Sequence, residues 1–127
     1  MKTLRISTIL LASLAITACA TPLPQIDYYD VETDSLRKMR TMKVIDDASR
    51  AEGEYRLLGQ VKGLYCDRTP PYALTPEDTA IDQVKLRAAM KGADHIGTPA
   101  CETRTTWDFT NNCFSTVTCT AEALVAD

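Results

Sequence analysis

The sequence lacks the features of several large protein classes. Its 127 residues contain only 5 Gly and 6 Pro, too few for a collagen-like or low-complexity chain, and they contain no internal repeat. No run of 18 uncharged apolar residues is present to cross a bilayer as a helix of the mature chain. Basic residues do not predominate: 14 Lys and Arg against 17 Asp and Glu give a formal charge of −3, so we expect no nucleic-acid partner. With 45% hydrophobic and 24% charged residues, the composition predicts one small folded domain.

Residues suited to catalysis are equally scarce. The only histidine, His95, would need a nucleophile as its partner, and the acidic residues form no recognisable catalytic pair. A solvent-facing or capping role is the simpler interpretation of His95. We therefore expect a protein that is not an enzyme and that carries no metal or diffusible cofactor.

The N-terminus has the pattern of a bacterial lipoprotein. Lys2 and Arg5 form a short positive region, and residues 6–18 are a 13-residue uncharged run of signal-peptide length. The run ends in Ile16-Thr17-Ala18-Cys19, an apolar residue and two small residues before a cysteine. An ordinary signal peptide with a chance cysteine is the alternative. The pattern predicts cleavage after residue 18 and a diacylglycerol and an N-acyl chain on Cys19.

The residues after Cys19 predict where the lipoprotein goes and how it is attached. Ala20 follows the cysteine in place of the Asp that commonly retains lipoproteins at the inner membrane, so we expect lipid anchoring in the outer membrane with the domain facing the periplasm. Several acyl chains make such an anchor effectively permanent. Residues 19–41 show no long apolar period and are interpreted as a tether with a short helical turn near residue 35. Residues 42–127 are the expected folded domain.

Four cysteines remain for the domain, an even number in an oxidising compartment. They are Cys66, Cys101, Cys113 and Cys119. Their spacing fits neither a zinc knuckle nor a C-x-x-C redox motif. Residues 113–125 alternate like a half-buried strand, which would separate Cys113 and Cys119 by about 20 Å, too far for a disulfide. In a hairpin with residues 108–112 as its turn, Cys101 lies opposite Cys119, which leaves Cys66 for Cys113.

The remaining patterns predict an α+β fold. Residues 42–48 and 55–66 are expected strands, and Gly59 and Gly63 mark places where a backbone could approach closely. Thr75 as N-cap and Gly92 after Lys91 bound an expected helix. Residues 96–107 and 113–125 complete the order β-β-α-β-β, an antiparallel sheet of about four strands with one main helix and two interlocked disulfides. Pro99 predicts an edge or a bulge, and Trp107 is expected in the core, with exposure as a partner anchor the alternative.

Four segments of the chain carry a family resemblance: LLGQVKGLYC (57–66), AAMKGADHI (88–96), CET (101–103) and CFSTVTCTAEAL (113–124). They resemble the RcsF family of outer-membrane lipoproteins, the sensors of the Rcs envelope-stress phosphorelay. The likeness runs from about Met42 to Val125 and includes all four domain cysteines in order. Family members carry two nonconsecutive disulfides, which would here be Cys66–Cys113 and Cys101–Cys119, as the strand geometry also suggests.

The resemblance implies a signalling protein that acts by contact. In the family, the lipid end engages outer-membrane β-barrel proteins and their assembly machinery, and under stress the domain relieves repression by the inner-membrane protein IgaA. Two departures mark this chain as divergent: the proline-rich linker is reduced to Pro22 and Pro24, and the loop between Cys101 and Cys113 is long. The alternative is a structural or assembly-accessory outer-membrane lipoprotein with no signalling role.

Overall fold

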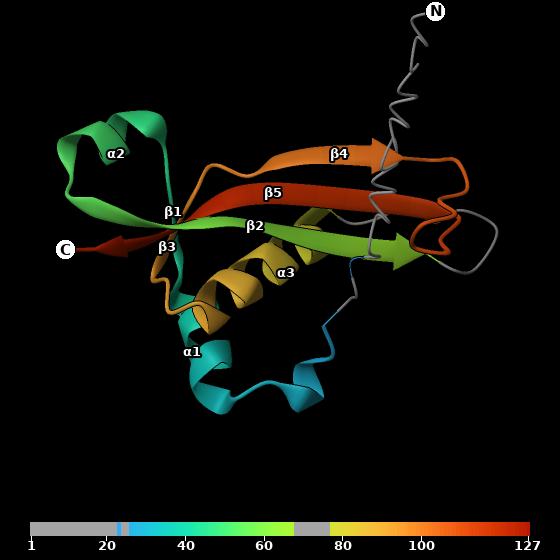
Figure 1. Ribbon diagram of the computed structural model, residues 1–127, viewed down its shortest axis with the longest axis horizontal. Helices are drawn as coiled ribbons and strands as arrows, with labels where there is room; N and C mark the ends of the chain where they lie inside the picture. The colour runs from blue at the N-terminus through green and yellow to red at the C-terminus, as the bar shows by residue number, and fades with distance from the viewer. Residues whose placement is uncertain (1–22, 24–25, 68–76) are drawn as a thin grey trace, which may run out of the picture.

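The computed structural model describes residues 23, 26–67 and 77–127, which form a sheet with one long helix packed across it (Figure 1). The expected α+β class is confirmed. The expected N-cap at Thr75 lies outside the described residues. In chain order the elements are η1 (Tyr28–Asp30), α1 (Thr33–Thr41), β1 (Lys43–Ile45), α2 (Asp47–Glu52), β2 (Tyr55–Asp67), α3 (Glu77–Met90), β3 (His95–Gly97), β4 (Ala100–Arg104) and β5 (Ser115–Ala126).

The last strand, β5, is the centre of the sheet. It pairs antiparallel with β2 along one side and with both β3 and β4 along the other, and β1 adds to β3 in parallel. The sheet is therefore mixed and has five strands, where the sequence predicted about four in an antiparallel arrangement. The expected strand 96–107 is divided into β3 and β4. Pro99 lies at the division, where its missing N–H interrupts a ladder.

Helix α3 packs on the sheet at a glycine. A Cβ built on Gly63 of β2 would lie 2.1 Å from the carbonyl oxygen of Ala80 and 2.6 Å from the amide nitrogen of Val84, so only glycine allows this approach. Val84 and Ala88 of α3 are fully buried, whereas Met90 at its end is 57% exposed. The close contact expected at Gly63 is confirmed.

Helix α3 ends in a Schellman motif. Gly92 has a φ of +89°, and its N–H donates to the carbonyl of Ala89 while the N–H of Ala93 donates to that of Ala88. The glycine predicted to end the helix is thereby confirmed in that role.

A bulge in β2 changes which of its residues face the core. Gly59 has a φ of +118°, and the register against β5 shifts between Leu57 and Gly59. The extra residue turns the preceding side chains over. Leu57 is consequently 51% exposed while Val61 is 4% exposed, although two residues four apart in a regular strand would share one face.

Residues assigned to the tether contribute to the folded layer. Helix α1 has nine residues, longer than the short turn expected, and packs against α3. Its Met39 contacts the hydrophobic core, and Asp34 forms ion pairs with Arg37 and Lys38 along the helix. No helix in the described part of the chain is long and apolar enough to span a membrane.

Candidate functional site

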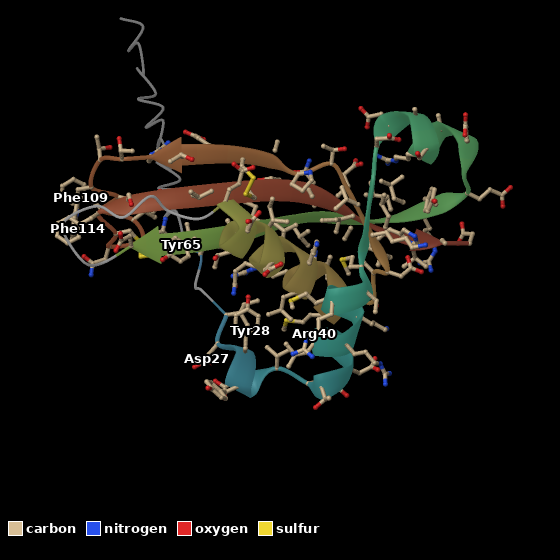
Figure 2. The ribbon with its side chains drawn as sticks, turned by 180° about the vertical axis from the view of Figure 1, so that it is seen from behind. Asp27, Tyr28, Arg40, Tyr65, Phe109 and Phe114 are labelled. Atoms are coloured by element: carbon tan, nitrogen blue, oxygen red, sulfur yellow. A yellow bond between two sulfur atoms is a disulfide. The ribbon has the colours of Figure 1, made fainter. Side chains whose placement is uncertain are left out.

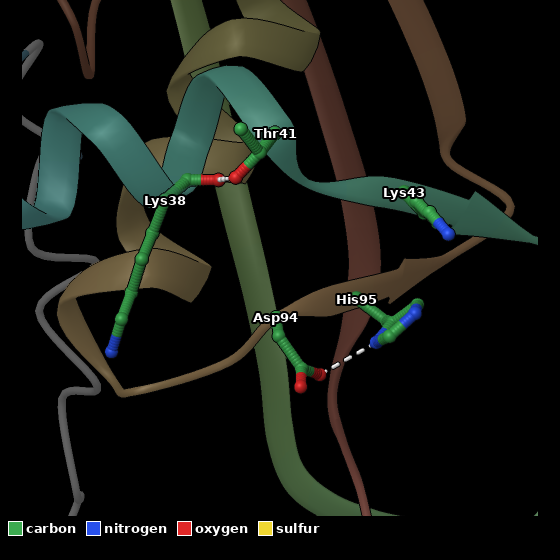
Figure 3. Close-up of a pocket in the computed structure, with 5 residues that line it drawn as sticks. All are labelled: Lys38, Thr41, Lys43, Asp94 and His95. Carbon is green, nitrogen blue, oxygen red and sulfur yellow. Dashed lines mark hydrogen bonds and ion pairs between the residues drawn. The ribbon is translucent and has the colours of Figure 1, made fainter.

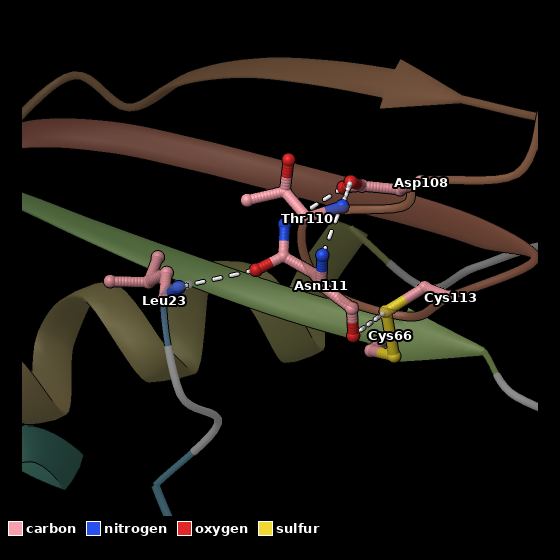
Figure 4. Close-up of a disulfide and its surroundings, with 6 residues drawn as sticks. All are labelled: Leu23, Cys66, Asp108, Thr110, Asn111 and Cys113. Atoms are coloured by element: carbon pink, nitrogen blue, oxygen red, sulfur yellow. Dashed lines mark hydrogen bonds between the residues drawn. A yellow bond between two sulfur atoms is a disulfide. The ribbon is translucent and has the colours of Figure 1, made fainter. Parts of the chain in front are cut away.

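The two disulfides have the expected connectivity. Cys101 of β4 lies directly opposite Cys119 of β5, with 4.0 Å between their Cα atoms. Cys66, near the end of β2, is bonded to Cys113 across a Cα–Cα distance of 5.5 Å (Figure 4). Cys113 and Cys119 are fully buried. The interlocked pairing that the sequence favoured is confirmed: Cys66–Cys113 ties the end of β2 to the segment before β5, and Cys101–Cys119 ties β4 to the middle of β5. Cys19 lies outside the described residues.

The loop before Cys113 is ordered by one carboxylate. Asp108 Oδ1 accepts hydrogen bonds from the amides of Thr110 and Asn111, at 2.9 and 3.2 Å, and Oδ2 accepts from the Asn111 side chain at 2.8 Å (Figure 4). The backbones of Asp108 and Cys113 exchange two further hydrogen bonds. The three hydrogen bonds to the carboxylate, above all the one from the Asn111 side chain, lower the pKa of the Asp108 carboxyl. The loop is therefore a closed turn fixed to the disulfide.

Three aromatic rings project from this turn and are here called the aromatic tip: Trp107, Phe109 and Phe114. The Trp107 ring meets Phe114 edge to face at a centroid distance of 4.5 Å and Phe109 at 6.1 Å. Phe109 is 87% exposed and Trp107 is 37% exposed. Trp107 is therefore a surface residue, and its expected place in the core is wrong. Figure 2 shows Phe109 and Phe114 at the end of the sheet opposite to α2.

The N-terminal segment is bound to the domain at two points. The amide of Ile26 donates to Gln83 Oε1 at 3.0 Å, and Gln83 Nε2 donates to the Ile26 carbonyl at 3.3 Å. The amide of Leu23 donates to Asn111 Oδ1 at 3.2 Å (Figure 4). Gln83 is fully buried in α3, and its spacing of three residues from both Ala80 and Leu86, which are buried and apolar, is the sequence signal that could have indicated it. The chain is thus fixed four residues after Cys19.

A groove runs beside this segment, between β2 and the second half of α3. It encloses about 550 Å³ and is lined by Leu23, Ile26, Gln60, Val61, Lys62, Arg87, Met90 and Lys91. Three of these residues are cationic and none is acidic. The groove can therefore receive an apolar or negatively charged segment, and the N-terminal segment forms one of its walls.

A second pocket contains His95, the only histidine of the chain and its candidate general base (Figure 3). His95 Nδ1 lies 2.6 Å from Asp94 Oδ1, and the Tyr55 ring packs edge on against the imidazole. Burial would raise the pKa of the Asp94 carboxyl, but hydrogen bonds from His95 and from the Ala126 amide outweigh it and lower the pKa. The Thr41 hydroxyl donates to backbone carbonyls of its own helix. Within the described residues, no hydroxyl or thiol is hydrogen-bonded to His95 as a nucleophile would be.

Neither a metal site nor a related protein assigns a function to the described structure. Across residues 23, 26–67 and 77–127, no three His, Cys, Asp or Glu side chains are placed to hold a metal ion. No protein-family model matches the sequence, and no curated protein matches it. The candidate site is therefore defined by geometry: a disulfide-stapled end of the sheet that displays the aromatic tip beside the bound N-terminal segment.

Proposed function

We propose that the protein is an outer-membrane lipoprotein that acts as an envelope-stress sensor and relays to the Rcs phosphorelay through protein–protein contacts. The observation that carries the proposal is the pair of interlocked disulfides, Cys66–Cys113 and Cys101–Cys119. The sequence pattern of residues 1–19, which predicts a lipoprotein signal, supports it. Disulfides of this kind persist in oxidising compartments such as the periplasm. The four cysteines that form these disulfides all belong to the segments that resemble the RcsF family.

The proposed activity is binding. The partners are the membrane, through the acyl chains of Cys19, outer-membrane β-barrel proteins with their assembly machinery, and the inner-membrane repressor IgaA or its equivalent. The exposed aromatic tip and the cationic groove supply surfaces for such contacts, since exposed aromatic residues dominate many protein interfaces. The Asp94–His95 pair has a structural explanation, because its carboxylate also accepts the amide of Ala126 at 3.2 Å.

A deletion strain tests the signalling role. Cells without the gene would carry a transcriptional reporter of the stress regulon and would be challenged by lipopolysaccharide or peptidoglycan damage. We expect a blunted response that the wild-type gene restores and that Cys19→Ser does not. An unchanged response in the deletion strain would refute signalling. In vivo crosslinking from the exposed face, followed by mass spectrometry, would identify the partner.

A structural or assembly-accessory role is the second candidate, and the attachment of Leu23 and Ile26 to the domain favours it. Hydrogen bonds to Leu23 and Ile26 fix the chain within seven residues of Cys19, which limits how far the domain can extend from an outer-membrane anchor. A protein with this role would co-purify constitutively with a barrel protein, and its deletion would leave the stress reporter unchanged.

A further inference from the structure

The aromatic tip is the one place in the described structure where three aromatic rings pack on one another at the surface. Phe109 is 87% exposed, and the Trp107 ring contacts both Phe109 and Phe114. Tyr28 and Tyr29 are a second pair of exposed aromatic residues, on η1, but they do not stand on a turn closed by a disulfide. A packed and exposed aromatic cluster marks a binding site.

The connection to Cys19 places this surface close to the lipid anchor. Leu23 is hydrogen-bonded to Asn111, a residue of the same turn that carries Phe109. Leu23 is the fourth residue after Cys19, and a fully extended chain spans at most about 3.6 Å per residue, so their Cα atoms can be at most about 14 Å apart. The headgroup and interfacial layer on one side of a bilayer is about 5 to 8 Å thick. A domain held on so short a connection can therefore touch the membrane surface.

The tip has the rigidity and the composition that an interfacial contact needs. Its turn is closed by the Asp108 hydrogen bonds and by the Cys66–Cys113 disulfide, so inserting the rings costs little additional ordering. Aromatic residues, tryptophan above all, concentrate at the boundary between headgroups and acyl chains. Removal of Lys2 and Arg5 with the signal peptide makes the chain more acidic, so charge would not attract it to anionic lipid.

We propose that the aromatic tip inserts into the headgroup region of the phospholipid bilayer that carries the acyl chains of Cys19. The domain then lies against the membrane by the disulfide-stapled end of its sheet, with α2 at the end directed away. This inference rests on the lipidation that is part of the proposed function. The lipid anchor supplies proximity, and the three rings fix the orientation.

Trp107 tests the inference without a label, because it is the only tryptophan in the chain. The full-length lipidated protein would be reconstituted into phosphatidylcholine vesicles, with and without bromine on the acyl chains. We expect bromine to remove at least half of the Trp107 emission and the vesicles to shift that emission to the blue. Neither effect should depend on salt, because charge does not drive the contact.

Matched variants separate insertion from folding. Phe109→Ser removes the most exposed ring of the tip and should reduce the bromine quenching at least twofold, while Tyr29→Ser removes a ring that is 97% exposed on η1 and should leave it unchanged. Both variants keep the disulfides and the core, and circular dichroism would verify that both are folded. Equal quenching in the two variants would overturn the proposal.

Two further outcomes distinguish the failure of the inference from the failure of the proposed function. If mass spectrometry finds no acyl chains on Cys19, both are wrong. If the protein is lipidated and Trp107 emission is the same with and without bromine, the membrane contact alone is wrong. Photocrosslinking from position 109 to a protein in intact cells, together with absent quenching, would assign the tip to a protein partner.

Discussion

Replacing Gly63 with alanine is expected to displace α3 from the sheet. The new Cβ would stand 2.1 Å from the Ala80 carbonyl oxygen, 2.6 Å from the Val84 amide nitrogen and 2.9 Å from the Gln83 Cβ. Two of these three atoms belong to the helix backbone, so a side-chain rotation cannot relieve the clash. A normal contact of about 3.2 Å requires the helix to move roughly 1 Å from β2, which opens a gap in the packed core around Ala80 and Val84.

The cost of that movement follows from measured overpacking effects. Inserting a methyl group into a packed core costs about 1 to 3 kcal/mol, and the backbone contact places Gly63→Ala at about 3 kcal/mol. With an m-value of about 1 to 3 kcal/mol/M for urea, the unfolding midpoint should fall by about 1 to 3 M. Circular dichroism in urea, with the disulfides intact, measures it.

Gly97 of β3 provides the matched control. A Cβ on Gly97 would meet its nearest neighbour, the Glu122 Cβ, at 3.8 Å, which is ordinary contact. Gly97→Ala should change the free energy of unfolding by less than about 1 kcal/mol. If the two variants unfold at the same urea concentration, the packing of α3 on Gly63 is not as described, and the account of the core fails with it.

Three further predictions concern the staple, the bound segment and the pH dependence. Cys101→Ala with Cys119→Ala opens a loop of sequence separation 18, which should lower the free energy of unfolding by about 3 kcal/mol; unchanged thermal unfolding would contradict this. Gln83→Leu removes both hydrogen bonds to Ile26 and should accelerate its amide hydrogen exchange, whereas unaltered protection would show that Gln83 does not hold the segment. The lowered pKa of Asp94 contributes stability above its unfolded value of 3.8, and this contribution is lost as the pH falls through the folded pKa. Asp94→Asn should therefore be less stable than wild type at pH 7, with the difference shrinking in acid; a difference that is constant across pH would reject this role.

The long strands and the helix end could be predicted from the sequence because their signals are local. Alternating side chains placed strands at 55–66 and 113–125, and the structure has β2 at Tyr55–Asp67 and β5 at Ser115–Ala126. Glycine at position 92 marked the end of α3. The disulfides followed from the same periodicity, since a hairpin with a known turn determines which cysteines lie opposite each other.

The missed features depend on contacts between distant parts of the chain. Strand β1 lies within the strand expected at residues 42–48, but its parallel pairing with β3 joins segments about fifty residues apart, and no local pattern indicates that pairing. The Gln83 side chain binds a backbone 57 residues away. Trp107 was misplaced because an aromatic residue beside a turn has the same local pattern whether it faces the core or solvent.

The central position of β5 has a consequence for how the protein is made. Strands β2, β3 and β4 all pair with β5, the twelve residues Ser115–Ala126. A chain that is synthesised from its N-terminus therefore cannot form this sheet until β5 has been made. Until then β2 has no neighbour, and α3 has only part of the surface that it covers. The sheet of the domain is therefore completed only when β5 is present.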